Sequence, residues 1–418
     1  MLKRFIAILT SSAASQIVLF IGGILVAKIL SPSEFGLLNE MTTLLGWMLP
    51  LACFSFAYSI PLENRRESIY SLAFGSGLLS VLAIIVVVVP IWFYLDFRGI
   101  TLSFWVYFLS LWVFVFVIAL YQVCEQSIIF LRFTRLHVKC LLFCAISTVF
   151  FRVWVSYFYS SGVFAALGNV FGFLIYVLTA LFYFRRERNF YTASKVNLAG
   201  VCSFLRKYWK LPVFKATEGF INLVSQGAPI IVLGVFWSAE AAGYYALVKL
   251  ILVMPMSVLS KSLVDSLFPF MVSKWSKREK ISKELLKLVF LKIVLGLLLT
   301  VLVFAFGEWA LEAVFSEKWS KAGEYMVWVA LWSSSMFVVC LVPNVFLMLD
   351  KAQFNFYIST LKLLSRSAVI VFFVLSSFSA VHMVAVISLV GLVINICVLF
   401  FVFWYLISVE NRRSKVTT

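Results

Sequence analysis

The sequence predicts an all-α polytopic membrane protein with twelve transmembrane helices, in two pseudo-symmetric lobes of six around a central cavity. The first observation is composition, because 63% of the 418 residues are apolar, 13% are charged and the mean hydropathy is +1.05. The second is that apolar runs long enough to cross a bilayer recur along the whole chain. Both observations exclude a soluble enzyme and leave no room for a large extramembrane domain.

Apolar runs bounded by charged or turn residues are the expected spans. A spanning helix needs ~20 apolar residues, and these runs meet that length. The first run is too long for a signal peptide and is followed closely by a second, so we interpret it as an uncleaved span. The runs cover residues 5–29, 37–60, 70–95, 100–123, 138–158, 162–184, 211–237, 243–266, 284–306, 325–348, 357–378 and 381–407.

Lysine and arginine are distributed unequally between the two sides of this topology. The chain holds 35 of them against 18 acidic residues, and the predicted loops place 23 on one side and 3 on the other. Because cytoplasmic loops carry the excess of positive charge, we expect a protein of the bacterial inner membrane with both termini in the cytoplasm. The net charge therefore reflects topology and contact with anionic membrane lipid, and no nucleic acid is expected.

Similar turns follow the first helix of each half of the chain. Residues 31–37 read Ser-Pro-Ser-Glu-Phe-Gly-Leu, and residues 238–244 read Ser-Ala-Glu-Ala-Ala-Gly-Tyr. Six spans lie on each side of one long cytoplasmic connection, so both halves enter the membrane from the same face. The expected organisation is an N-lobe over residues 1–190, a connection over 191–210 and a C-lobe over 211–418, which is typical of an alternating-access transporter.

Nine cations remain within or at the ends of the spans once the loops are counted. A charge at the centre of a bilayer costs several kcal/mol, so these side chains require a water-filled cavity, ion-pair partners or an anionic ligand. The nine are Lys28, Arg152, Lys215, Lys249, Lys261, Lys287, Lys292, Lys362 and Arg366.

The deepest of these cations form the candidate anion-binding site. Arg366 lies near mid-depth in the eleventh span with Lys362 one turn before it, and Arg152 is the counterpart in the N-lobe. The planar fork of arginine suits bidentate contact with phosphate, and lysine adds a point charge. The alternative for Lys362 is that it snorkels toward the cytoplasmic surface.

The remaining cations divide between the candidate site and the membrane interface. Lys249 and Lys261 lie in the eighth span and are further candidates for substrate binding. Asp265 follows Lys261 by four residues and offers a competing ion pair. Lys287 and Lys292 open the ninth span beside a basic loop, so we expect both to be interfacial anchors.

A polar stripe runs along the seventh span. Glu218, Asn222 and Gln226 recur at steps of four residues, and Gln16 lies halfway along the first span. One interpretation is a cavity wall that binds sugar hydroxyls. The alternative is an ion pair between Lys215 and Glu218, with amides that bond neighbouring helices.

Carboxylates within or near spans are the candidates for ion coupling. A carboxylate in a low-dielectric cavity can titrate near neutral pH, as proton antiport requires, and paired carboxylates also suit Na⁺. Glu40, Glu125, Glu218 and Asp265 are the acidic residues within or near the predicted spans, and Glu218, Asp265 and Glu40 are the candidates selected from them. No metal site or other cofactor is expected, since the seven cysteines form no CxxC pair and the chain has no GxxxxGK[ST] loop.

Two short motifs carry a resemblance to a known family. They are Leu-Ser-Pro-Ser-Glu-Phe-Gly at residues 30–36 and Phe-Ser-Glu-Lys-Trp at residues 315–319. With these motifs, its length and its division into six plus six spans, the chain resembles the polysaccharide and lipid-linked oligosaccharide flippases of the multidrug/oligosaccharidyl-lipid/polysaccharide exporter superfamily, especially the bacterial O-antigen (Wzx-type) members.

The resemblance implies a carrier rather than an enzyme. Its substrate would be an undecaprenyl-pyrophosphate-linked oligosaccharide, such as an O-antigen repeat unit of lipopolysaccharide biosynthesis. An ion-coupled antiporter of this kind would move it from the cytoplasmic to the periplasmic leaflet, with a polysaccharide polymerase and a chain-length regulator as partners.

Two alternatives stay open beside the flippase. A cation-coupled multidrug exporter of the same superfamily should present intramembrane carboxylates, whereas this chain presents mainly cations. A membrane-embedded oligosaccharide polymerase or glycosyltransferase should carry acidic groups on a sizeable extracytoplasmic loop, and the longest such loop predicted is 307–324.

The topology can be tested with reporter fusions. Reporters placed after Arg66, Arg188 and Lys415 should be active in the cytoplasm, and reporters after Arg98 and Lys318 in the periplasm, because the charge bias orients the spans. A periplasmic signal after Arg188 would contradict the division into two six-helix lobes.

Overall fold

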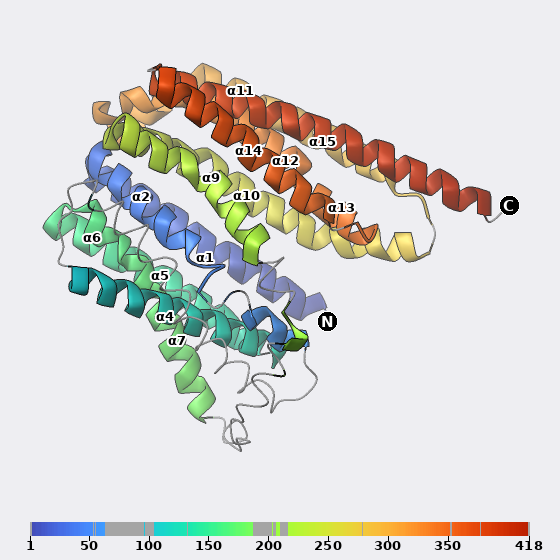
Figure 1. Cartoon of the computed structure of the whole chain (residues 1–418), viewed down its shortest axis with the longest axis horizontal. Coiled ribbons are helices and arrows are strands. Elements are labelled where there is room, and N and C mark those ends of the chain that lie inside the picture. The colour runs from blue at the N-terminus through green and yellow to red at the C-terminus, as the bar shows by residue number, and fades with distance from the viewer. Residues whose placement is uncertain are drawn as a thin grey trace. The chain divides into compact units, whose positions relative to one another are not determined.

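The structure, a computed structural model, is helical throughout the part of the chain that it describes (Figure 1). The chain divides into two compact units. Unit 1 comprises Met1–Leu30 and Leu37–Gly227, and unit 2 comprises Ser31–Gly36 and Ala228–Thr418. The described residues are 2–52, 54, 56–62, 96, 104–131, 133–186, 203, 206–209, 216–277, 279–351, 353–376 and 378–416.

Unit 1 is built around α5, which packs against α1 and α7, while α4 packs against α7. The predicted span 162–184 is divided at Leu167 into a short helix, α6, and α7, although together they remain one candidate crossing. The elements are α1 (Leu2–Ile29), α2 (Pro32–Trp47), η1 (Phe56–Leu62), α4 (Phe104–Phe130), α5 (Thr134–Tyr159), α6 (Gly162–Ala166) and α7 (Gly168–Arg186).

Unit 2 is built around α12, which packs against α10, α11 and α15. The contact boundaries divide two helices between the units, because α2 begins in unit 2 and the helix that starts at Thr217 begins in unit 1. The elements are α9 (Thr217–Phe236), α10 (Ala239–Ser276), α11 (Ser282–Phe315), η4 (Glu317–Ala322), α12 (Gly323–Val339), α13 (Val342–Met348), α14 (Gln353–Ser376) and α15 (Ala380–Val416).

Nine helical segments in the described part are long and apolar enough to cross a bilayer, and a shorter apolar helix covers Ala14–Ile29. The predicted all-helical membrane fold is therefore confirmed. The predicted span 70–95 and the start of the span 100–123 lie outside the described residues. The total of twelve spans and the lobe boundaries at 190 and 210 stay predictions.

Two predicted spans are interrupted in the structure. In the span 37–60, α2 ends at Trp47 and the chain turns before η1. Pro50 lies in this turn, and a proline disfavours the helical conformation of the residue before it. In the span 325–348, α12 ends and α13 begins with Pro343 in its first turn. A proline is tolerated there because the first N–H groups of a helix have no intrahelical acceptor.

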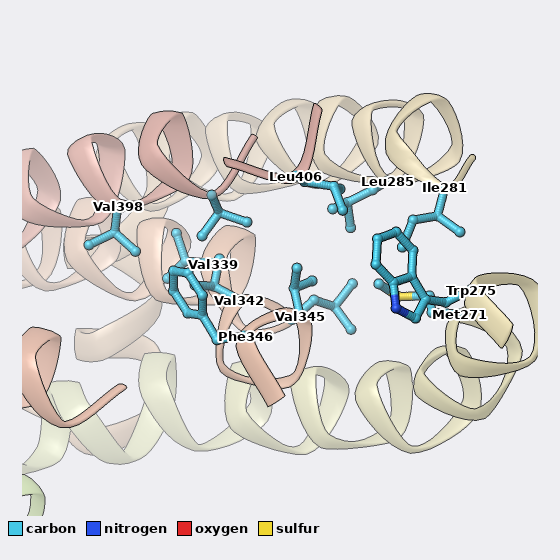
Figure 2. Packing of buried hydrophobic residues seen from close by; sticks show 12 residues of the cluster. Met271, Trp275, Ile281, Leu285, Val339, Val342, Val345, Phe346, Val398 and Leu406 are labelled. Carbon is cyan, nitrogen blue, oxygen red and sulfur yellow. The ribbon is translucent and has the colours of Figure 1, made fainter. Parts of the chain in front are cut away.

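The core of unit 2 joins five helices near one end of the unit (Figure 2). Phe346 and Val345 of α13 are fully buried in it, and Trp275 near the end of α10 is 9% exposed. Side chains of α11, α12 and α15 complete the cluster. Its members are Met271, Trp275, Ile281, Leu285, Val339, Leu341, Val342, Val345, Phe346, Val398, Val402 and Leu406.

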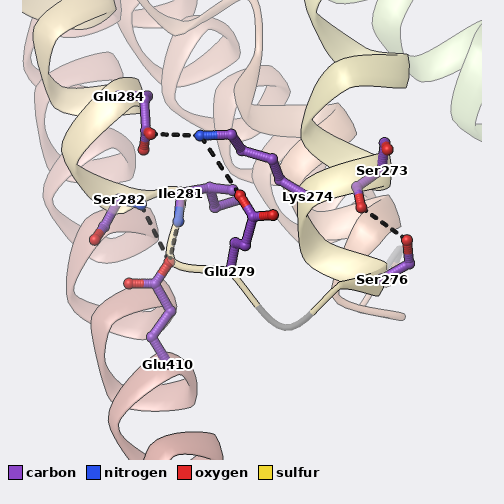
Figure 3. A network of polar contacts seen from close by, with 8 residues as sticks. All are labelled: Ser273, Lys274, Ser276, Glu279, Ile281, Ser282, Glu284 and Glu410. Atoms are coloured by element: carbon purple, nitrogen blue, oxygen red, sulfur yellow. Dashed lines mark hydrogen bonds and ion pairs between the residues drawn. The ribbon is translucent and has the colours of Figure 1, made fainter.

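Polar contacts close the same end of unit 2 (Figure 3). The carboxylate of Glu410, on α15, is 5% exposed and accepts hydrogen bonds from the backbone N–H groups of Ile281 (2.8 Å) and Ser282 (3.1 Å). It thereby satisfies two donors at the start of α11, where a negative charge also complements the helix dipole. Lys274 of α10 donates to Glu284 of α11 at 2.7 Å. Side chains of both α15 and α10 therefore bind the first turn of α11.

The two repeat-related turns meet inside unit 2. A Cβ atom on Gly36 would overlap the carbonyl oxygen of Ala239 and lie 2.9 Å from the backbone nitrogen of Gly243. Reciprocally, a Cβ on Gly243 would overlap the carbonyl oxygen of Pro32 and lie 3.2 Å from the nitrogen of Gly36. The starts of α2 and α10 therefore cross backbone to backbone, at a distance that only glycine permits.

Trp319 of η4 packs beside this crossing and is fully buried. The ring of Phe35 contacts its ring edge-on with centroids 5.6 Å apart, and the ring of Tyr244 does so at 6.0 Å. The motifs at 30–36 and 315–319, far apart in sequence, thus form one aromatic cluster at the glycine crossing.

Replacing Gly243 by valine should destabilise unit 2, because the added side chain would collide with backbone atoms that cannot rotate away. We expect a cost of about 1–3 kcal/mol or more, seen as a lower melting temperature and a lower yield of monodisperse protein in detergent. Gly46 is the matched control, since nothing lies within 4 Å of its Cβ position, and Gly46→Val should behave like the wild type. Equal melting temperatures for the two variants would contradict the close crossing.

Candidate functional site

Arg366 is the most deeply placed cation of the candidate site. It lies on α14 and is 6% exposed. Its guanidinium carbon stands 5.0 Å from the ring centroid of Trp332 on α12, a cation–π contact that orients the charged group. The guanidinium of Arg366 is therefore held inside unit 2, against the ring of Trp332.

Two lysines join Arg366. Lys362 lies one turn earlier on α14, and Lys249 comes from α10, where its ammonium group stands 5.6 Å from the ring centroid of Tyr245. Both lysines lie close enough to Arg366 to interact with it electrostatically. Three of the predicted substrate-binding cations thus form one cluster, and an anion that contacts all three would relieve their mutual repulsion.

Arg152 lies in unit 1 and is held by neutral partners. Its Nη2 donates to Oδ1 of Asn169 on α7 at 2.8 Å and to Oγ1 of Thr42 on α2 at 3.3 Å. Gly168 leaves room for its aliphatic stem, because a Cβ there would lie 2.7 Å from the Cγ of Arg152. Within the described part of the chain no carboxylate contacts this guanidinium, and its Nε and the nearby Ser156 Oγ are buried without a protein partner.

Two residues of the predicted polar stripe are joined on α9. Nε2 of Gln226 donates to Oδ1 of Asn222 at 3.0 Å, and Asn222 is exposed while Glu218 is half-buried. The alternative interpretation pairs Glu218 with Lys215, which lies outside the described residues, so this ion pair stays a prediction. Beside the stripe, Trp47 of α2 donates to the carbonyl oxygen of Leu223 at 3.0 Å.

The other predicted site residues are scattered. Gln16 on α1 is half-buried, Glu40 on α2 is fully buried in unit 1, and Lys261 on α10 is exposed. Asp265 lies on α10, but its side chain is outside the described residues. None of these positions is brought to the cluster around Arg366 by a described contact.

Lys292 differs from its predicted role as an interfacial anchor. It is 3% exposed, and its Nζ donates to Sγ of Cys340 at 3.1 Å and stands 5.3 Å from the ring centroid of Phe337. The prediction was wrong because α12 covers this face of α11. The position of Lys292 along the span does not reveal that contact.

A second polar cluster lies in unit 1, and the sequence indicated only Glu125 of it, as one of the carboxylates near the predicted spans. The hydroxyl of Tyr121 donates to Oε1 of Glu125 at 3.2 Å, and Nδ1 of His137 and the hydroxyl of Tyr176 lie 3.1 Å apart in a hydrogen bond. The sequence shows His137, Cys140 and Cys144 on one helical face, but the tyrosine partners come from other helices. Among the described residues no group of three His, Cys, Asp or Glu side chains is placed to hold a metal ion.

Apolar helices long enough to cross a bilayer, with cations buried between them, define a multi-pass membrane protein. Residues 25–324 match a family model described as "Polysaccharide biosynthesis protein". The chain belongs to this family, and the predicted membership of the polysaccharide and lipid-linked flippases is confirmed. No curated protein sequence matches the chain significantly.

Solved transporters share the fold. The structure is similar to "Lipid II flippase MurJ, inward closed conformation", with a TM-score of 0.70 at 12% identity over 95% of this chain and 87% of the other. It is also similar to an inward-facing "multidrug resistance MATE family transporter of the MOP superfamily", with a TM-score of 0.65 at 11% identity over 95% and 96% of the two chains. At such identities the likeness concerns the fold.

Replacing Lys292 by methionine should leave the melting temperature unchanged or raise it. The described contacts of Lys292 are a thiol and an aromatic ring, so an apolar side chain of similar length removes the cost of burying an amine. Thermal unfolding in detergent measures this, with Lys287→Met on the exposed face of α11 as the control. A marked fall in melting temperature for Lys292→Met alone would show that the amine stabilises unit 2.

Proposed function

We propose that the protein is a flippase that moves a polyprenyl-pyrophosphate-linked oligosaccharide from the cytoplasmic to the periplasmic leaflet by alternating access. The observation that carries the proposal is the cluster of Arg366, Lys362 and Lys249 inside unit 2. Family membership and the transporter fold support it. The inner membrane is the proposed location, with both termini in the cytoplasm.

The cluster matches the chemistry of a pyrophosphate. Such a head group carries at least two negative charges, and isolated charges cannot enter hydrocarbon without a very large desolvation cost. Cations fixed inside the membrane offset that cost. Arg366 supplies directional N–H donors and is oriented by Trp332, while Lys362 and Lys249 add charge around it.

Arg152 is the proposed anion-binding residue of unit 1. Asn169 and Thr42 occupy one nitrogen of its guanidinium and hold the group in place, so the remaining donors are available to a phosphate oxygen. Its charge is therefore preorganised without being neutralised by a described carboxylate.

Other predicted residues complete the proposal. Amides of Asn222, Gln226 and Gln16 suit sugar hydroxyls, and Lys261, an exposed cation on α10, is a further candidate for substrate binding. Coupling to H⁺ or Na⁺ would use carboxylates such as Glu218, Asp265 and Glu40. O-antigen or a similar surface polysaccharide is the proposed cargo, and a polymerase and a chain-length regulator are the proposed partners.

A multidrug exporter is the second candidate, because the fold is also that of MATE transporters. Cationic drugs need carboxylates in the binding site, whereas the cluster in unit 2 is cationic. An oligosaccharide polymerase is less consistent with the structure, because residues 307–324 are occupied by the end of α11 and by η4, with Trp319 buried.

Transport of a lipid-linked oligosaccharide into proteoliposomes tests the proposal. Arg366→Ala and Arg152→Ala should each slow transport about tenfold or more, because each loses a charge-assisted hydrogen bond to the pyrophosphate. Arg366→Lys and Arg152→Lys should retain part of the activity, since the charge remains. Protection of the sugar from an enzyme added outside the vesicles measures the rate.

Lys287→Ala is the matched control, because Lys287 is an exposed cation outside the cluster. It should transport at the wild-type rate. Wild-type rates in a correctly folded Arg152→Ala/Arg366→Ala double variant would exclude this pair as the anion site. Efflux of cationic drugs by the wild type, with no movement of lipid-linked sugar, would favour the exporter.

A further inference from the structure

A cluster of titratable side chains in the interior of unit 1 has no role in the anion site. It draws on three helices. Tyr121 and Glu125 come from α4 and are one turn apart, His137 comes from the first turn of α5, and Tyr176 comes from the middle of α7. Glu125 accepts from Tyr121 at 3.2 Å, and His137 is hydrogen-bonded to Tyr176 at 3.1 Å.

The two hydrogen-bonded pairs are in direct contact. The rings of Tyr121 and Tyr176 meet edge-on with centroids 4.8 Å apart, and the His137 ring lies 6.4 Å from that of Tyr176. Glu125 also interacts electrostatically with the hydroxyl groups of both tyrosines. A proton gained or lost by the carboxylate of Glu125 or by the imidazole of His137 therefore changes the electrostatic environment of all four side chains.

An apolar core encloses this cluster. Tyr176 is fully buried and His137 is 9% exposed, while Glu125 is half-buried. In such an apolar environment the cost of each charged form depends strongly on the neighbouring groups. The enclosing core residues are Cys124, Ile128, Leu136, Cys140, Val177, Ala180 and Phe184.

The groups that face the cluster from the packed elements are weak acids and thiols. Cys124 lies on α4, and Cys140 and Cys144 lie on α5. The helix η1, which packs on α4, carries one titratable side chain, Tyr58. The helix α1, which also packs on α5, has no titratable side chain between residues 5 and 27. The charged residues near the same ends of α5 and α7 point to solvent, and they are Arg135, Lys139 and Arg185.

The cluster also lies within reach of one membrane surface. Glu125 is five residues from the end of α4 at Phe130, and His137 is three residues from the start of α5 at Thr134. At a rise of about 1.5 Å per residue, both lie within ~8 Å of the loop between these helices. The predicted topology assigns that loop to the cytoplasm.

We propose that Glu125, Tyr121, His137 and Tyr176 form a proton-binding site in unit 1, and that proton binding there drives or gates the transport cycle. The reaction is the addition of H⁺ from the cytoplasmic side to the Glu125 carboxylate or the His137 imidazole, with the two phenols as hydrogen-bond partners. The role of this site in transport rests on the proposed function. Proton coupling is thereby assigned to this cluster rather than to Glu218, Asp265 or Glu40.

Infrared titration of the purified protein in lipid nanodiscs tests the site without any substrate. Between ~pH 8 and 5, a carboxylic-acid C=O band should grow in the wild type and be smaller by one carboxyl in Glu125→Gln. Tyr121→Phe should shift the midpoint of that band because it removes a hydrogen-bond donor to the carboxylate. His137→Gln should shift it indirectly, because it changes the partner of Tyr176, which interacts electrostatically with Glu125. Tyr183→Phe, an exposed tyrosine on α7, is the matched control and should leave the midpoint unchanged.

Transport tests the functional half. A pH gradient should accelerate the movement of lipid-linked oligosaccharide by the wild type and by Glu240→Gln, an exposed carboxylate control on α10. Glu125→Gln should lose that acceleration, and His137→Gln should shift its pH dependence. Full acceleration in Glu125→Gln, or a Glu125 band whose midpoint ignores His137 and Tyr121, would overturn the proposal. A wild type that titrates as expected but moves no lipid-linked sugar would instead contradict the proposed function.

Discussion

Hydrocarbon cannot solvate charges or unpaired backbone groups, and this constraint governs the structure. Every described crossing segment is a helix because a helix satisfies its own N–H and C=O groups without water. Polar side chains inside the membrane face the same constraint. Arg152 is held by Asn169 and Thr42, and Lys292 lies against a thiol and a ring. The protein retains these costly groups where helices can shield and orient them.

Helix ends are a second consequence of the constraint. The first N–H groups of α11 have no acceptor in their own helix, and the buried carboxylate of Glu410 supplies one from α15. The start of α10 is held differently, by a backbone crossing with α2 at Gly36 and Gly243. In both cases the start of a helix is stabilised by residues that are distant in the sequence.

The two polar sites differ in their chemistry. In unit 2, Arg366, Lys362 and Lys249 gather positive charge around aromatic rings, which suits an anionic head group. In unit 1, Glu125 and His137 are bonded to phenols within an apolar core, which suits a proton. A carrier that moves a charged lipid head group under a proton gradient needs both kinds of site.

The sequence alone determined the membrane fold, most helix positions and the presence of cations inside the bilayer, because hydropathy and charge act locally along the chain. It also supplied Arg366 and Lys362 as a pair, since a spacing of four residues places them on one helical face. Only the tertiary structure decided which cations meet. Lys249 joins Arg366 from α10, whereas α12 buries Lys292 away from the interface. The bonds of Glu125 and His137 to tyrosines were equally hidden, because which faces of separate helices touch depends on packing across the whole unit.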